Sequence, residues 1–254
     1  MIAFSCYALL IGSVLSMVIY RLPMMLKQDE HTGETGTRPI FNLFLPRSHC
    51  THCKKTIPFY HNIPLVSYLL LRGRCHFCQH PIAWQYPAIE ALTLILSLCA
   101  VYKFGFHLDL IWVLPFIWLI LCLGFIDLEH QLLPDNLTLT LLWLGLLVNT
   151  QTVFCSLPNA VWSAAGAYLS LWLLIKIFYM FTGKIGMGHG DFKLFAALGA
   201  WFGWMSLTPI LLIACVLGTV IGLSYLGLTR QDRNTPMPFG PYLCIAGLCY
   251  LFFY

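Results

Sequence analysis

The chain has 254 residues, of which 9% are charged and 59% are hydrophobic, and its formal net charge is +4 at pH 7. Soluble globular domains carry about 25% charged residues, so this composition excludes an ordinary water-soluble protein and indicates a chain that lies mostly in lipid. Basic cytoplasmic loops and contact with membrane lipids explain the small positive charge. The sequence shows no internal repeat or recognition motif that favours a nucleic-acid partner.

Apolar segments recur along the chain, and about 20 such residues cross the core of a bilayer. The first segment has no basic region ahead of it and no small-residue cleavage site, so we expect a retained helix rather than a signal peptide. The sixth is short and can merge with the seventh, and the last has only 15 residues. The sequence predicts an all-α polytopic membrane protein with about eight transmembrane helices, or seven. The segments are about 2–20, 88–104, 110–126, 137–155, 158–180, 192–205, 206–228 and 240–254.

Basic residues are unevenly distributed between alternate loops. Eight Lys and Arg residues lie between the first two spans, and four more lie in or beside the loops that follow the fifth and seventh. The loops 105–109, 150–157 and the region around 204–207 contain none. Because basic loops stay in the cytoplasm, the N-terminus is predicted to lie outside and the long first loop inside. The basic residues are Arg21, Lys27, Arg38, Arg47, Lys54, Lys55, Arg72, Arg74, Lys184, Lys193, Arg230 and Arg233.

The first loop, residues 22–86, differs in composition from the rest of the chain. It holds six of the nine His residues and seven of the fourteen Lys and Arg residues. Its polar stretch at 29–36 is predicted to be a flexible loop. The sequence therefore predicts a first transmembrane helix over 1–21, a cytoplasmic domain over 22–86 and a transmembrane bundle over 87–254.

Two C-x2-C pairs lie in this cytoplasmic domain, with 21 residues between them. This spacing is typical of a structural zinc site, in which four thiolates complete the tetrahedron and leave no open position. Disulfides or free thiols are the alternative, but the reducing cytosol disfavours disulfides and a domain of about 60 residues has too small a core to hold itself. The predicted ligands are Cys50, Cys53, Cys75 and Cys78, and the flanking residues that could replace one of them are His49, His52, His76 and His80.

Acidic residues are rare, with ten in the chain, so those at membrane depth indicate function. Asp127 ends the third span, and Asp191 begins the sixth within Gly-Met-Gly-His-Gly-Asp. The third span runs inward and the sixth outward, so both carboxylates are expected at the cytoplasmic edge. Two facing carboxylates in a dry site share one proton, and such a pair can activate water and protonate a peptide carbonyl, as in aspartic proteases.

Other roles are open for the acidic residues. Asp191 could cap a helix and Asp127 could mark a helix interface. Asp135, which follows Pro134, is predicted to be the N-cap of the fourth span. Glu90 is interpreted as a snorkelling or polar-packing residue near the start of the second span. The chain could also be a transporter with an acidic proton relay, or a thiol-redox protein that uses its cysteine pairs.

Motifs occur in order along nearly the whole chain. They are Gly12-Ser13, Val18 to Pro23, the two cysteine pairs, Asn62-Ile63-Pro64, Leu71 to Cys75, Tyr86-Pro87, Glu90, Ile126 to Asp135, Gly186 to Lys193, and Pro238 to Pro241. Together they resemble the bacterial type IV prepilin peptidases, a leader peptidase/N-methyltransferase family of intramembrane aspartic peptidases with a GxGD motif. Val14 and Ser16 stand where that family often has Phe and Asn, which bears on local packing rather than on activity.

The resemblance implies that the chain cuts the basic leader from type IV prepilins and pilin-like type II secretion precursors, after a Gly at the cytoplasmic membrane face. Asp127 and Asp191 are implied to be the catalytic pair, and the four cysteines the family's tetracysteine set. The resemblance also implies a bacterial inner-membrane location with a periplasmic N-terminus. It further implies methylation of the new N-terminal residue, usually Phe, by S-adenosylmethionine, although no nucleotide-binding fingerprint indicates where that donor binds.

Overall fold

The computed structural model describes residues 1–30, 42–43, 45, 47–50, 52–58, 63–183, 187–229 and 238–253. Within these ranges the regular secondary structure is entirely helical, and two isolated β-bridges join His49 to Thr56 and Arg74 to Pro81. The predicted all-α class is confirmed. Outside the described residues lie most of the 29–36 loop, Arg38, Asn62, Lys184, Gly186, Arg230, Arg233 and Tyr254.

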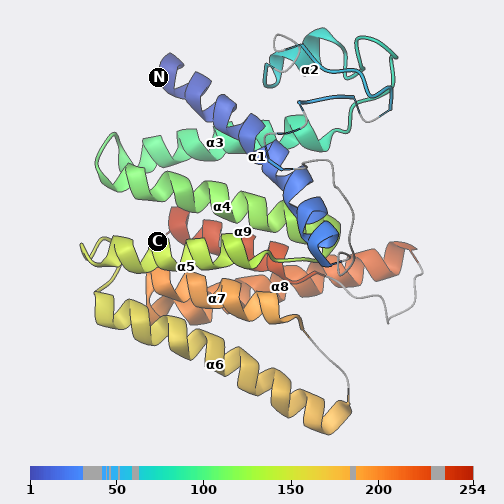
Figure 1. Ribbon diagram of the computed structural model, residues 1–254. Helices are drawn as coiled ribbons and strands as arrows, with labels where there is room; N and C mark the ends of the chain where they lie inside the picture. The colour runs from blue at the N-terminus through green and yellow to red at the C-terminus, as the bar shows by residue number, and fades with distance from the viewer. Residues whose placement is uncertain are drawn as a thin grey trace. The chain divides into compact units, whose positions relative to one another are not determined.

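Nine helices occur in the described residues (Figure 1). Eight of them coincide with the eight apolar segments predicted from the sequence, and the short helix α2 is additional. The helices are α1 (Ile2–Glu30), α2 (Val66–Leu70), α3 (Gln85–Phe104), α4 (Asp109–His130), α5 (Asp135–Asn149), α6 (Leu157–Thr182), α7 (His189–Phe202), α8 (Trp204–Thr229) and α9 (Gly240–Phe253).

Five helices in the described part of the chain, α1, α3, α4, α6 and α8, are long and apolar enough to cross a membrane, as in a multi-pass membrane protein. Helices α5, α7 and α9 have 14 or 15 residues and are shorter than a full span. The eight predicted apolar segments are therefore all helical in the described residues, but only five of these helices are long enough to span a membrane. The sixth and seventh segments do not merge, because Gly203, with a φ of 79°, separates α7 from α8.

The helices form two compact units, Met1–Phe106 and His107–Tyr254. In the first unit α1 packs against α3, and a Cβ at Gly12 would lie only 3.0 Å from the α3 backbone. Arg21 is buried in α1 and donates a hydrogen bond of 3.1 Å to the backbone oxygen of Asn42. This bond ties the helix to the segment that precedes the cysteines.

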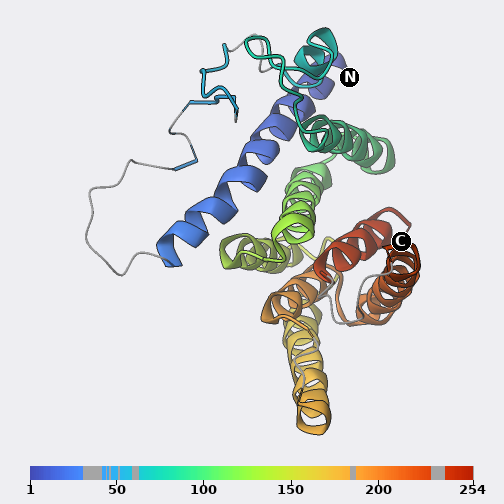
Figure 2. The ribbon, with the colours of Figure 1, turned by 90° about the vertical axis from the view of Figure 1, so that its right-hand side faces the viewer.

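Helix α7 is central in the second unit and lies between α5 and α6 in both ribbon views (Figure 1 and Figure 2). Most of its side chains are buried. A Cβ at Gly145 of α5 would lie 2.5 Å from the Trp201 ring, and one at Gly199 of α7 would lie 3.0 Å from the backbone oxygen of Ser163. Small residues permit such close approach, which is how helices commonly associate in membranes.

Asn149, the last residue of α5, is fully buried and holds the C-terminal end of α7. Its amide nitrogen donates to the backbone oxygens of Ala200 and Trp201, both at 2.8 Å. Its amide oxygen accepts from the backbone N–H groups of Phe154 at 3.1 Å and Cys155 at 3.0 Å. The last carbonyls of a helix lack intrahelical partners, so the Asn149 side chain provides hydrogen-bond donors for two of them. The same side chain also accepts two N–H groups of the loop between α5 and α6.

Candidate active site and metal centre

Helix α4 places Asp127 in its last turns. The helix ends where Gln131 adopts a left-handed φ of 51°, and the Gln131 N–H donates to the Asp127 backbone oxygen at 2.9 Å. The Asp127 side chain is only 5% exposed. The carboxylate is therefore held at a helix end but inside the protein.

Helix α7 places Asp191 in its first turn. Gly188 is the residue before the helix, so Asp191 is not its N-cap, and the Asp191 N–H donates to the Gly188 oxygen at 3.3 Å. The side chain is 7% exposed. A buried carboxylate at this position lies near the positive end of the helix dipole, which favours negative charge there.

The structure brings the two aspartates together, close enough for their charges to interact. The backbone N–H of Gly240, the first residue of α9, faces the Asp127 carboxylate, and a Cβ on that glycine would lie 2.6 Å from Asp127 Oδ2. A Cβ at Gly190 would lie 2.8 Å from Leu133, and one at Gly240 would lie 3.2 Å from the same side chain. The ends of α4, α7 and α9 thus meet with the α4–α5 loop around an acidic pair.

Two oxygens of this pair have no partner. Asp127 Oδ2 and Asp191 Oδ1 are buried without a hydrogen bond, and no other buried side-chain nitrogen or oxygen in the described residues is in that state. Leaving a buried polar atom unsatisfied costs about 1–3 kcal/mol, so folded proteins rarely do it. Such atoms on two neighbouring carboxylates are expected where a proton, a water or a substrate group is the partner.

The four predicted metal ligands lie together in the first unit, with all four sulfur atoms within 4.8 Å of one another. All four are free thiols rather than disulfides. The sulfurs of Cys50 and Cys78 are 3.8 Å apart. A tetrahedral site with Zn–S bonds of about 2.3 Å requires sulfurs about 3.8 Å apart, so the cluster has the size needed to hold a metal ion. Its members are Cys50, Cys53, Cys75 and Cys78.

The two cysteine pairs fold as a backbone repeat. The first cysteine of each pair donates its N–H to the carbonyl five residues later, at 3.0 Å for Cys50 and 2.9 Å for Cys75. Four residues after each of these cysteines the backbone is left-handed, with a φ of 59° at Lys54 and 58° at Gln79. Both pairs therefore form the same kind of knuckle, although the two copies share few residues besides the cysteines.

Two thiols of the cluster have pKa values that are shifted in opposite directions. The backbone N–H of Cys53 contributes most to lowering the pKa of the Cys50 thiol, to about 6. The backbone of His80 lowers the pKa of the Cys78 thiol, but burial and hydrogen bonds to the other three cysteines outweigh it and raise this pKa to about 11. The thiolate is the form that binds metals, so Cys50 is closer to its binding form than Cys78. The rings of His52 and His80 stack with centroids 4.5 Å apart and lie outside the four-sulfur group.

Comparison with known proteins identifies both halves of the chain. The bacterial peptidase A24 N-terminal domain matches residues 6–104, and the type IV leader peptidase family matches residues 114–223. A prepilin leader peptidase/N-methyltransferase from Legionella pneumophila is 52% identical over 254 aligned residues, which cover 97% of this chain and 88% of that protein. The chain belongs to the type IV leader peptidase family.

Other members of the leader peptidase family show similar agreement. Proteins with the same name from Stutzerimonas stutzeri and Pseudomonas aeruginosa are 45% and 44% identical, each over 94% of this chain and 86% and 85% of their own lengths. No solved structure matches this chain. The cysteine cluster falls within the matched N-terminal domain, and both aspartates fall within the matched peptidase domain.

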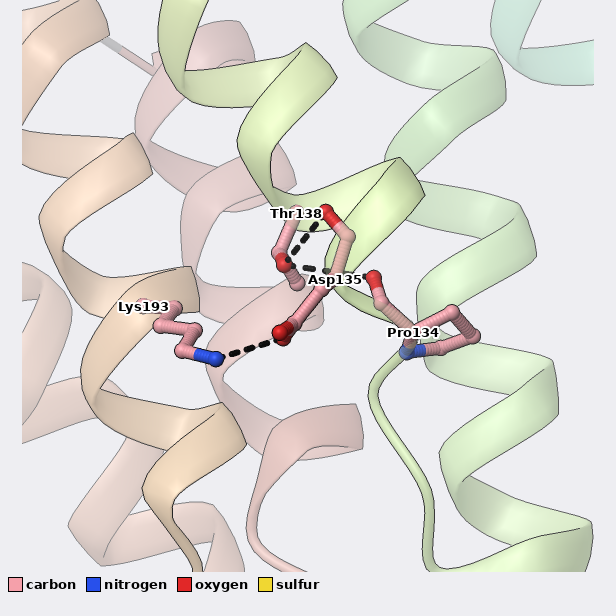
Figure 3. Close-up of polar contacts among 4 residues, drawn as sticks. All are labelled: Pro134, Asp135, Thr138 and Lys193. Atoms are coloured by element: carbon pink, nitrogen blue, oxygen red, sulfur yellow. Dashed lines mark hydrogen bonds and ion pairs between the residues drawn. The ribbon is translucent and has the colours of Figure 1, made fainter. Parts of the chain in front are cut away.

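An ion pair joins α5 to the helix that carries Asp191 in this leader peptidase. Lys193 Nζ and Asp135 Oδ1 are 2.6 Å apart and join the first turns of α7 and α5 (Figure 3). Asp135 is the first residue of α5 and Pro134 precedes it, so the N-cap prediction for Asp135 is wrong. The carboxylate instead contacts a helix distant in sequence. Because Lys193 is two residues from Asp191, the pair restrains the turn that carries this aspartate.

Sequence reasoning did not identify Gly240 and Leu133 as neighbours of the acidic pair, although both lie in motifs that carried the resemblance. It also did not single out Cys244, which is buried and close enough to both aspartates for their charges to act on it. The only sequence signal for Gly240 and Leu133 was that they lie in these motifs. Which motifs come into contact depends on how the helices pack. For Glu90 the polar-packing interpretation fits: its Oε2 accepts the backbone N–H of Leu65 at 2.8 Å.

Proposed function

We propose that this protein cuts the basic leader from type IV prepilins and pilin-like type II secretion precursors, with Asp127 and Asp191 as the catalytic pair. The main support is the two unpartnered, buried oxygens on neighbouring carboxylates, both within the matched peptidase domain. The relatives that cover nearly the whole chain are named prepilin leader peptidase/N-methyltransferase. Cleavage follows a Gly at the end of the leader.

The chemistry needs only the two carboxylates and a water molecule. One carboxylate is ionised and takes a proton from water while the water oxygen bonds to the scissile carbonyl carbon. The other is protonated and donates its proton to the carbonyl oxygen, which gives a neutral tetrahedral intermediate. The carbon–nitrogen bond then breaks as the leaving amine takes a proton from the carboxyl group that activated the water, while a hydroxyl of the intermediate returns a proton to the other carboxylate. The two carboxyl groups share one proton throughout, so apparent pKa values belong to the pair.

The protein acts, in this proposal, in a bacterial inner membrane with its N-terminus in the periplasm. The cysteine domain and the aspartates then face the cytoplasm, where the basic leader of a precursor lies. This orientation follows from the basic residues of the first loop and of the loops after α6 and α8.

Zinc is the proposed ion at Cys50, Cys53, Cys75 and Cys78. Four thiolates fill the tetrahedron of this ion, so it acts as a cross-link in a small domain and not as a catalyst. The size of the four-sulfur cluster supports this assignment.

The protein is also proposed to methylate the new N-terminal residue, usually Phe. S-adenosylmethionine would supply the methyl group, and the chain must hold the amine deprotonated and shielded from water. The name shared by the relatives supports this second activity. None of the residues in the acidic pair is assigned to it.

Replacing one carboxylate tests the peptidase proposal. Asp127→Asn and Asp191→Asn should each lower precursor cleavage by roughly 10⁴-fold, because an amide can neither take nor share the proton. Cleavage is read from the N-terminal mass of the product after incubation with a precursor in reconstituted membranes. Asp109→Asn is the matched control, since Asp109 is exposed at the opposite end of α4. Near-normal cleavage by a well-folded Asp127 or Asp191 variant would remove that residue from the mechanism.

A further inference from the structure

Helix α2 has its apolar side chains on the outside. Val66, Leu69 and Leu70 are 46%, 74% and 78% exposed, whereas Ser67 is 6% exposed. Residues three and four apart share one face of a helix, so these three side chains form a single surface, here called the α2 face. A helix on a water-exposed surface has the opposite pattern, with polar residues outward. The α2 face is therefore suited to contact an apolar surface.

A buried carboxylate ties α2 to a membrane helix. Glu90, in the second turn of α3, is 9% exposed and accepts the backbone N–H of Leu65 at 2.8 Å. Leu65 has a φ of 56° and a ψ of −46°, and the Val66 N–H bonds to the Pro64 oxygen across it. This γ-turn is rare and strained for a residue with a side chain, so other contacts must hold it.

The hydrogen bond between Glu90 and Leu65 holds α2 close to α3. Helix α3 is one of the helices long enough to cross a membrane, and Glu90 is close to its first residue. Both ribbon views place α2 beside the first turns of α3 (Figure 1 and Figure 2). Trp84, just before α3, is 69% exposed, and Trp commonly lies at the level of lipid headgroups. If α3 crosses the bilayer, its first residues and the α2 face beside them lie at the level of the lipid headgroups.

The exposed charged side chains that flank α2 in the sequence are positive, whereas the Glu90 carboxylate is buried. Arg72 and Arg74 follow α2 directly and both are exposed. Lys54 and Lys55 are exposed in the first cysteine pair. No Asp or Glu occurs anywhere from residue 35 to residue 89. Basic side chains next to exposed leucines are the combination that binds anionic lipid surfaces.

We propose that the α2 face docks on the anionic lipid surface of the membrane that α3 enters. Leu69 and Leu70 enter the boundary between headgroups and acyl chains, and Arg72 and Arg74 contact lipid phosphates. The continuity with α3 and the exposed basic side chains favour anionic lipid over a precursor leader, because a basic leader is repelled by them. The docking is independent of the proposed peptidase chemistry, because it uses neither aspartate.

Photo-cross-linking of the full chain tests the docking. A benzoylphenylalanine residue replaces Leu70 in protein reconstituted into nanodiscs of phosphatidylglycerol with phosphatidylcholine, or of phosphatidylcholine alone. The same residue at Thr56, which is exposed in the first cysteine pair and outside the α2 face, is the control. After illumination, mass spectrometry should find phosphatidylglycerol attached at position 70, several-fold more than at position 56. Attachment instead to a precursor, to a second copy or to another part of the chain would overturn the proposal.

Hydrogen exchange gives a second readout that does not depend on the probe. Amides of residues 66–71 should exchange several-fold more slowly in nanodiscs that contain phosphatidylglycerol than in phosphatidylcholine alone. The double variant Leu69→Ser and Leu70→Ser should lose this difference while it still cleaves precursor. Asp191→Asn should retain the difference, so failure of the peptidase proposal and failure of lipid docking are distinguishable. Equal exchange in both lipids for the unaltered chain would reject docking.

Discussion

The space beside Asp127 is kept open by the absence of a side chain at Gly240. A Cβ at that position would lie 2.6 Å from Asp127 Oδ2 and 3.0 Å from its Cγ, closer than real Cβ contacts allow. The same Cβ would lie 3.2 Å from Leu133 Cδ1, so a side chain at this position is crowded by Leu133 as well. At the residue scale, the position of the Asp127 carboxylate therefore depends on Gly240, which has no side chain.

Gly240→Ala should lower cleavage by about 10- to 100-fold, because displacement of a catalytic group by a fraction of an ångström to one ångström is costly. The protein should still insert and bind metal. Gly227→Ala in α8 is the control, since a Cβ at Gly227 meets nothing within 4 Å. Initial cleavage rates on one precursor, measured for both variants, decide the matter. Equal rates would show that the Asp127 carboxylate does not need its observed position.

At the scale of elements, α7 is held at both ends. The Asp135–Lys193 ion pair restrains its first turn, and Asn149 binds its last carbonyls. Both partners of the ion pair are partly exposed, and exposed pairs contribute little to stability, so its main effect is on position. The fully buried amide of Asn149 is energetically more important, because its loss leaves buried carbonyl and N–H groups without partners.

Asn149→Ala should destabilise the second unit by about 1–3 kcal/mol, the range for a buried polar group left unpaired. Unfolding midpoints in a detergent titration measure this change. Asn136→Ala is the matched control, because Asn136 lies on the same helix with its side chain exposed. A shift no larger than that of the control would mean that water replaces the amide in holding α7.

At the scale of the whole molecule, the metal centre and the acidic pair lie in different compact units. All four metal ligands belong to the first unit, and both aspartates belong to the second. Loss of the metal should therefore affect the first unit before the second. A small domain with few buried apolar side chains has little else to stabilise it.

Cys75→Ser should remove bound zinc and make the cysteine domain sensitive to trypsin, while the unfolding midpoint of α4 to α9 stays unchanged. One zinc ion per unaltered chain is expected by elemental analysis of protein purified without chelators. Cys215→Ser is the control, because Cys215 is exposed on α8 and distant in sequence from the cluster. A metal-free unaltered protein with a trypsin-resistant cysteine domain would contradict a structural zinc site.

The two proposed activities should also be separable. Methyl transfer to an amine needs an oriented donor and a deprotonated amine, and it has no evident use for a carboxylate pair. Asp191→Asn should therefore still transfer labelled methyl from S-adenosylmethionine to a pilin supplied already cleaved and beginning with Phe. Should the well-folded variant transfer no label while the unaltered enzyme does, both reactions depend on Asp191.

The sequence by itself predicts the fold class and the candidate site residues of this protein. The apolar helices, the four cysteines and the two aspartates were all readable from sequence, because hydrophobic length, C-x2-C spacing and rare acidic residues are properties of short segments. The family resemblance rested on such segments in order, and the comparisons confirmed it.

Only the tertiary structure decided how those segments meet. Three contacts join residues that are far apart in the chain. They are Gly240 with Asp127, Lys193 with Asp135, and Asn149 with the end of α7. The outward apolar face of α2 and the contact between Glu90 and Leu65 likewise come only from the structure. Contacts of this kind depend on the packing of whole helices, for which the spacing of residues in one segment carries no information.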